Sequence, residues 1–191
     1  NGNMRILTRE GQERTWFYHN VRLQRPDQTE YVLGHALDVT DQRETDERLR
    51  KSEEQLRMII DAEPECVKIT TEDGIVHQMN PAGLAMLEAS DESMVLGKSV
   101  YDVIAPEYHE KYRDLTASVF KEKPGLLEFE IIGMKGTRRW LETHAVPLHD
   151  EKGKIATMLS LTRDITERRR TESKIREQAA LLDVDPAAIS L

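Results

Sequence analysis

The sequence predicts an α+β fold in which an antiparallel sheet carries helices over one face. Two short strand-like runs are followed by a block of helical segments, and three longer strand-like runs follow that block. Strands and helices that are grouped in this way are typical of α+β domains. Part of the pattern also occurs twice, which predicts more than one unit along the chain.

The domain opens with a helix and a hairpin. The helix runs to Asp61 and is stopped by Pro64, because the residue before a proline avoids helical backbone angles. The strand-like runs CVKIT (66–70) and IVHQMN (75–80) follow, separated by the turn EDG. These two runs predict the first two strands of the sheet.

Helices occupy the middle of the domain. Asn80 is placed as the N-cap of a short helix, with Pro81 at its first position. Gly97 and Pro106 break the next segment into short helical turns. Residues 106–123 then predict an amphipathic helix with one apolar face. That face consists of Tyr108, Tyr112, Leu115 and Val119.

Three strand-like runs close the domain, at 126–132, 138–148 and 155–164. The middle run has apolar residues at both parities, so alternation does not settle which of its faces points to the core. The junction after the last run is repeated, because DVT at 38–40 recurs as DIT at 164–166. Upstream of each copy, Trp16 recurs as Trp140. A repeat of this length is typical of tandem globular domains.

Two polar helical stretches, 41–56 and 167–182, separate the repeated parts. Their apolar residues are few, and in the first stretch Leu49 and Leu56 lie one heptad apart. So thin an apolar stripe favours a two-stranded coiled coil or a solvated connector. We therefore expect a homodimer that forms through these connector helices.

Composition excludes several classes of protein. The net charge of −8 argues against a nucleic-acid partner, and the basic run 168–170 is interpreted as a solvated helix face. No apolar run is long enough to span a membrane, so we expect no membrane contact. The single cysteine rules out a disulfide framework and a Cys-rich metal site, and is compatible with a cytoplasmic location. No nucleophile motif or phosphate loop appears, so the segment is expected not to be an enzyme.

Several motifs, in order, resemble the PAS domain, a small sensor and interaction module. DGIVHQMNPAGLAML (73–87) is similar to the family's Asp-Gly, Asn and Ala pattern, and LGKSVYDVIAPE (96–107) to the segment that follows it. Arg139-Trp140 and the closing Asp-Ile-Thr at 164–166 resemble the C-terminal signature. The resemblance covers about 110 residues. It implies a five-stranded antiparallel sheet with helices over one face, and a pocket able to hold a ligand.

The resemblance also divides the chain into successive parts. IIDAEPECVKI (59–69) matches LLDVDPAAISL (181–191), which predicts the opening of a further copy. The predicted parts are the C-terminal part of a preceding PAS domain (1–40), a helical connector (41–56), a complete PAS domain (57–166), a second connector (167–182) and the start of a further PAS domain (183–191).

The function that the resemblance implies is sensory relay in a bacterial signalling protein of the histidine kinase or cyclic-nucleotide enzyme type. An output domain would then lie further along the same polypeptide. The alternative is a ligand-free structural module that serves for dimerisation and spacing.

The repeated junction is predicted to set the angle between strand and helix. Thr166 and Thr40 are placed as N-caps, each accepting a hydrogen bond from the first helical turn. Asp164, and likewise Asp38, stands at the strand end, where the family ties it to backbone or to a basic group. Arg139 or Arg163 can supply that group. Trp140 completes the signal-junction residues.

A ligand pocket is predicted between the sheet and the long helix. Its candidate residues are Met79, Leu87, Val100, Ile104, Tyr108, Tyr112, Phe129 and Trp140. The plainer interpretation is that these side chains simply fill the core. The cofactor is unknown. Haem is disfavoured because His109 falls about one turn early and is expected at the surface, and a flavin photosensor is disfavoured because Cys66 lies outside the required motif.

Overall fold

The structure is a computed structural model that describes residues 1–182. The chain divides into two compact units, Asn1–Met58 and the part from Ile59 onward. Each unit is described by itself. The predicted start of a further PAS domain at 183–191 lies outside the described residues.

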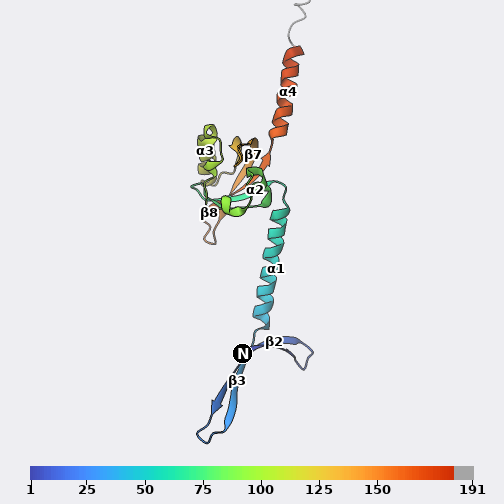
Figure 1. Ribbon diagram of the computed structural model, residues 1–191, viewed down its shortest axis with the longest axis vertical. Helices are drawn as coiled ribbons and strands as arrows, with labels where there is room; N and C mark the ends of the chain where they lie inside the picture. The colour runs from blue at the N-terminus through green and yellow to red at the C-terminus, as the bar shows by residue number, and fades with distance from the viewer. Residues whose placement is uncertain (183–191) are drawn as a thin grey trace, which may run out of the picture. The chain divides into compact units, whose positions relative to one another are not determined.

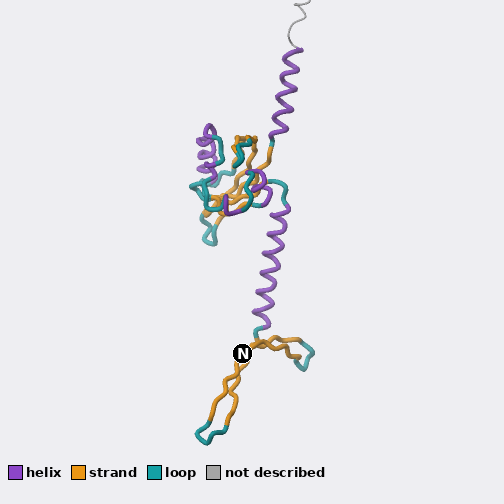
Figure 2. The backbone as a smooth tube through the Cα atoms, in the orientation of Figure 1, coloured by secondary structure: helices purple, strands orange, loops and turns teal. Residues whose placement is uncertain are grey.

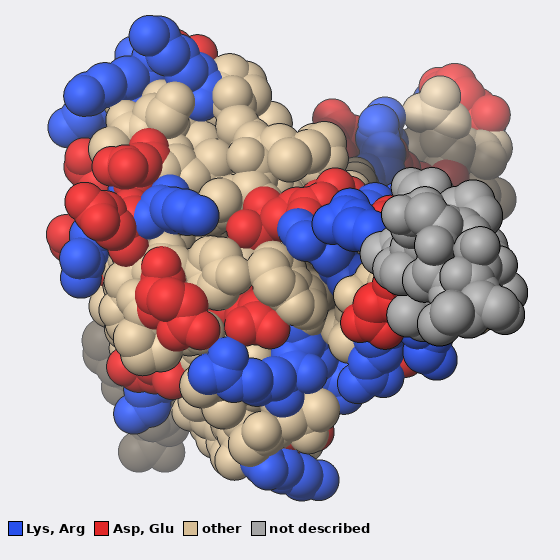
Figure 3. Space-filling model, turned by 90° about the horizontal axis from the view of Figure 1, so that it is seen from above, with Lys and Arg blue, Asp and Glu red and all other residues tan. Residues whose placement is uncertain are grey.

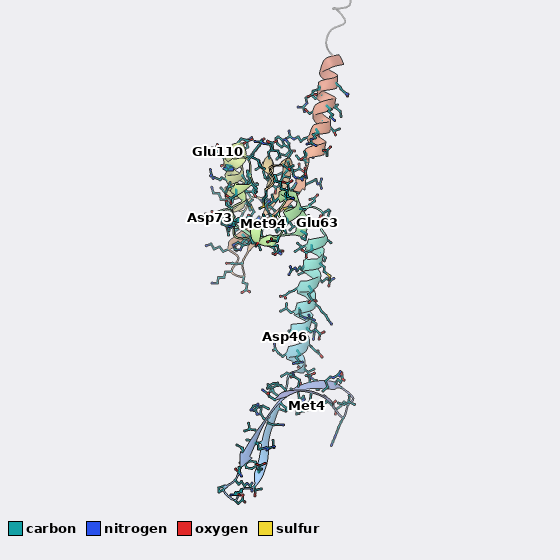
Figure 4. All side chains as sticks on the ribbon, viewed as in Figure 1. Met4, Asp46, Glu63, Asp73, Met94 and Glu110 are labelled. Atoms are coloured by element: carbon teal, nitrogen blue, oxygen red, sulfur yellow. The ribbon has the colours of Figure 1, made fainter. Side chains whose placement is uncertain are left out.

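The first unit is a three-stranded antiparallel sheet followed by a helix. Its strands β1 (Gly2–Leu7), β2 (Glu13–Gln24) and β3 (Glu30–Asp38) pair in the order β1-β2-β3 (Figure 2). The helix α1 (Thr40–Ala62) begins two residues after β3 and contains the whole predicted connector 41–56, and its last four residues, 59–62, belong to the second unit. Its side chains, including Asp46, project outward (Figure 4). Leu49 and Leu56 are each more than half exposed, so the thin apolar stripe has no partner within this helix's own unit.

The second unit has the predicted order of elements. Its strands and helices are β4 (Cys66–Thr70), β5 (Val76–Met79), α2 (Pro81–Leu87), α3 (His109–Val119), β6 (Gly125–Ile132), β7 (Arg138–His149), β8 (Ile155–Asp164) and α4 (Thr166–Leu182). Three short 3₁₀ turns lie between α2 and α3, namely η1 (Glu92–Met94), η2 (Val100–Asp102) and η3 (Pro106–Tyr108). The five strands form an antiparallel sheet in the order β5-β4-β8-β7-β6, which confirms the predicted α+β fold.

Helices α2 and α3 pack on the sheet, α2 against β4 and α3 against β6 and β7 (Figure 1). The close approach of α2 depends on Gly83, because a Cβ atom there would lie 2.7 Å from the Cys66 sulfur. Asn80 begins this helix as predicted, its side chain accepting a hydrogen bond from the Gly83 amide at 3.0 Å. The structure thus confirms the cap that the sequence predicts.

The face of β7 that points to the core is now clear. Leu141, Thr143 and Ala145 are buried, whereas the residues between them are at least partly exposed. In β8, the alternate residues Met158, Ser160 and Thr162 are buried in the same way. The inner face of the sheet therefore carries several hydroxyl groups, and Trp140 lies on the opposite face.

Helix α3 is shorter than predicted. Tyr112, Leu115 and Val119 form its buried face, as the periodicity predicts. Tyr108 was expected on this face but lies in η3, before the helix, where its ring packs edge-on against Trp140 at 5.7 Å. The prediction fails there because Pro106 starts a 3₁₀ turn rather than the α-helix itself.

Among the helices of residues 1–182, none combines the length and the apolar character that crossing a membrane requires. Lys and Arg side chains are interspersed with Asp and Glu over the surface drawn in Figure 3. Charges of both signs therefore share this face, against a net charge of −8 for the whole chain.

Candidate functional site

A cavity of about 700 Å³ lies between the inner face of the sheet and the helical segments. Six of the eight predicted residues line it: Met79, Leu87, Val100, Ile104, Tyr112 and Phe129. Met94 of η1, which Figure 4 labels, lines it too. A concave, largely apolar site of this size can enclose a small organic molecule.

Tyr108 and Trp140 do not line the cavity. Trp140 follows Arg139 and precedes the buried Leu141, so strand alternation turns it to the outer face. Tyr108 packs against it from η3. The prediction that these two residues belong to the pocket is therefore wrong.

The cavity wall also carries polar groups that the sequence analysis did not single out. Lys68 on β4 is buried and donates a hydrogen bond from Nζ to the Thr162 hydroxyl at 3.0 Å. The Thr162 and Thr143 hydroxyls lie 2.8 Å apart. The Tyr112 hydroxyl is buried without a hydrogen-bond partner among the described residues. Strand alternation predicts that Lys68 shares a face with Cys66, and this was the available clue.

Cys66 and His109 both line the cavity. Cys66 is a buried core residue, as predicted, and burial raises the pKa of its thiol although the charge of Lys68 lowers it.

His109 is half-buried rather than at the surface, which corrects the prediction. Its ring packs against Tyr101, and its Nε2 lies 2.9 Å from the Ile104 carbonyl oxygen, to which it donates.

The strand-to-helix junction is built around Asp164, the last residue of β8. One carboxylate oxygen accepts a hydrogen bond from the Thr166 amide at 2.9 Å, and the other pairs with Arg139 on β7 at 3.0 Å. Arg163, the other predicted partner, pairs with Glu65 instead. Partial burial raises the pKa of the Asp164 carboxyl. Its hydrogen bonds with Thr166 and its pairing with Arg139 lower the pKa by more than burial raises it, so the pKa lies below the ordinary 3.8. The carboxylate is therefore ionised at neutral pH.

Thr166 does not act as the predicted N-cap. Its hydroxyl accepts a hydrogen bond from the Trp140 amide of the neighbouring strand at 2.9 Å. The Asp164 carboxylate takes over the first-turn amide, because Thr166 already has helical geometry and lies within α4. The hydroxyl is thereby freed to join the helix start to β7.

A second set of contacts fastens the first turn of α4 to the sheet. Arg168 pairs with Glu128 of β6 at 2.7 Å, and Arg169 also pairs with Glu128. The Arg169 guanidinium lies over the Trp140 ring, 4.3 Å from its centroid. The interpretation of 168–170 as a solvated face is confirmed for Arg168 and Arg170, which are exposed. It is wrong for the half-buried Arg169, since helical spacing alone could not show that Trp140 and Glu128 lie beneath it.

The cavity and the junction share one strand. Thr162 lines the cavity, and Asp164 lies two residues further along β8, paired in register with the cavity residue Leu141. Residues two apart on a strand point to the same side. Thr162 in the cavity wall is thus joined to the start of α4 by only three intervening residues of the chain.

A family profile described as the PAS fold matches residues 60–170, more than half of the chain. The chain belongs to the PAS family. The profile covers one PAS domain, so the interpretation of residues 1–40 and 183–191 as parts of further copies stays a prediction.

A curated relative is the "Two-component sensor PprA" of Pseudomonas aeruginosa. It is 26% identical over 192 residues, an alignment that covers 93% of this chain and 21% of the relative. The chain thus spans about a fifth of the length of that protein.

Solved PAS domains have the same fold. The PAS domain of an HTR-like protein from Haloarcula marismortui superposes with a TM-score of 0.58 at 21% identity, covering 64% of this chain and 99% of that one. A PAS domain from a two-component sensor histidine kinase gives a TM-score of 0.52 at 11% identity, covering 60% and 97%. At these identities the likeness shows the fold alone.

The junction of the PAS domain has a counterpart in the first unit. There the Thr40 amide donates to Asp38 at 3.0 Å, and the Thr40 hydroxyl accepts from the Thr15 amide at 2.8 Å. Hydrogen bonds to Thr40 lower the pKa of the Asp38 carboxyl below the ordinary 3.8. Thr40 therefore has the role of Thr166 and, like it, is not the predicted N-cap.

The predicted match of Trp16 with Trp140 is wrong by one residue. The amide that donates to the Thr40 hydroxyl belongs to Thr15, whereas the amide that donates to the Thr166 hydroxyl belongs to Trp140. In strand register, Trp16 lies opposite Asp38, and the residue opposite Asp164 is Leu141. Sequence matching joined the two tryptophans because they are rare and conspicuous. The hydrogen bonds place them at opposite parities of their strands.

Proposed function

We propose that residues 57–166 are a sensory and relay module of a bacterial signal-transduction protein, of the histidine kinase or cyclic-nucleotide enzyme type. The module itself performs no catalysis. It passes the state of its cavity, or of a dimer, through the connector helices to an output domain further along the polypeptide. The setting we propose is the cytoplasm.

The observation that carries the proposal is the arrangement along β8. Within five residues the chain passes from Thr162 in the cavity wall to Asp164 at the end of β8 and then to Thr166 in the first turn of α4. Because the carboxylate holds both Arg139 and the helix amide, a shift of either strand changes the direction in which the helix leaves the sheet.

The relatives and the helices support the same proposal. The curated relative is by its name a two-component sensor, and one of the similar PAS domains comes from a sensor histidine kinase. In α1, Leu49 and Leu56 are exposed one heptad apart, and Ile175 of α4 is exposed as well. These residues suit pairing with the same helices of a second copy.

The test joins the C-terminus of the 191-residue chain to the catalytic half of a histidine kinase and measures autophosphorylation. Leu87→Phe places ring carbons into the cavity, and Leu126→Phe, at a leucine that is 54% exposed and outside the cavity, is the matched control. We expect Leu87→Phe to change the rate at least about fivefold, the lower end of typical coupling between sites. Leu126→Phe should leave it unchanged. Equal rates in all three proteins would favour the ligand-free spacer.

A further inference from the structure

The cavity contains a buried cation. Lys68 lies in the middle of β4 on the inner face of the sheet, with only 6% of its surface exposed. Its neighbours on that face, Cys66 and Thr70, are buried too. Lysine is among the residues least often buried without a partner, so its presence in the wall calls for a physical reason.

The ammonium group of Lys68 is under-satisfied. It has three N–H donors, and within residues 1–182 it donates one hydrogen bond, to the neutral hydroxyl of Thr162. No carboxylate within residues 1–182 forms an ion pair with it. A buried charge costs free energy that one neutral hydrogen bond does not recover, so an anion would stabilise this site.

Most of the remaining wall is apolar, although Ser99, Asp102, His109 and the Tyr112 hydroxyl also line it. Met79, Leu87, Val100 and Phe129 contribute aliphatic and aromatic surface. The other cation of the lining, Lys98, is exposed rather than buried. A single buried ammonium suits one negative charge, whereas phosphate groups are bound by several donors or by the forked guanidinium of arginine.

We propose that this cavity binds a small organic acid with one carboxylate and an apolar body, the carboxylate lying on Lys68 Nζ. The proposal rests on the proposed sensory function, for which it supplies the ligand class. A carboxylate there would compete with Thr162 for the ammonium group. Thr162 lies two residues before Asp164, so the competition occurs beside the junction to α4.

The test compares octanoate with octanol, which share a chain and differ in the charged group, by calorimetric titration of the 191-residue chain at neutral pH. We expect octanoate to bind at least about tenfold more tightly, as a charge-assisted hydrogen bond provides. Lys68→Met should abolish the preference, and Lys98→Met, at the exposed lysine of the same cavity, should keep it. Lys68→Met should also raise the melting temperature of the ligand-free protein, because it removes an unpaired buried charge.

Three results would overturn the ligand class: octanol bound as tightly as octanoate, a preference that survives Lys68→Met, or no binding of either compound. The first and third need no variant, so they decide the matter even if Lys68→Met fails to fold. The kinase-fusion experiment with Leu87→Phe adds no carboxylate ligand. Its outcome therefore tests the relay separately from the ligand class.

Discussion

Asn80→Ala is expected to lower the free energy of unfolding by about 3 kcal/mol. The Asn80 side chain is 2% exposed and accepts hydrogen bonds from the amides of Val67 and Gly83, both at 3.0 Å. Its amide group donates to the carbonyl oxygens of Ile60, Glu63 and Glu65 at 2.9–3.2 Å. Losing a helix cap costs about 1 kcal/mol, and each buried group left without a partner costs about 1–3 kcal/mol.

Urea unfolding followed by circular dichroism measures this loss. Gln78→Ala is the matched control, since Gln78 is an exposed amide two residues earlier, on β5. It should change the free energy of unfolding by less than about 0.5 kcal/mol. If Asn80→Ala were as mild as Gln78→Ala, Asn80 would not be what joins the end of α1 to β4 and α2.

Asp164→Ala is expected to loosen the start of α4 while the PAS domain stays folded. The Thr166 amide loses its acceptor, and Arg139 loses its anion. A hydrogen bond to a charged group at a partly exposed site contributes about 1.4 kcal/mol, so amide exchange at Thr166 should become about tenfold faster.

The measurement is hydrogen exchange read residue by residue by NMR. Asp114→Ala is the control, because Asp114 is an exposed aspartate of α3. It should leave exchange at Thr166 unchanged. An unchanged Thr166 rate in Asp164→Ala would show that the carboxylate does not hold the helix start.

Much of the fold could be predicted because it depends on local patterns. Residues 66–70 were predicted as a strand and are β4, and Asn80 caps α2 as its position before Pro81 predicts. Six of the eight predicted cavity residues line the cavity, because apolar side chains on the inner sheet face and the covering helices must meet there. The parity of β7 could not be predicted from the sequence, and this ambiguity misplaced Trp140.

The site details that were missed depend on contacts between distant segments. The sequence shows that Thr166 starts a helix but not that the Trp140 amide lies within reach of its hydroxyl. Lys68 looks like an ordinary strand residue until the fold buries it next to Thr162, 94 positions away in sequence. Glu128 and Arg169 likewise meet only when β6 lies beneath α4.

The account depends on one claim, that a change inside the cavity reaches α4 through Asp164. The most direct test measures hydrogen exchange at Thr166 and Arg169 with and without Leu87→Phe, once with Asp164 present and once in Asp164→Ala. The Arg169 amide donates to the Ile165 carbonyl oxygen at 2.9 Å, so it reports on the first turn. The account predicts that Leu87→Phe changes exchange at both amides by at least about fivefold with Asp164 present, and not in Asp164→Ala. Exchange rates at these amides that Leu87→Phe leaves unchanged, or that it changes by the same factor in Asp164→Ala, would contradict the account.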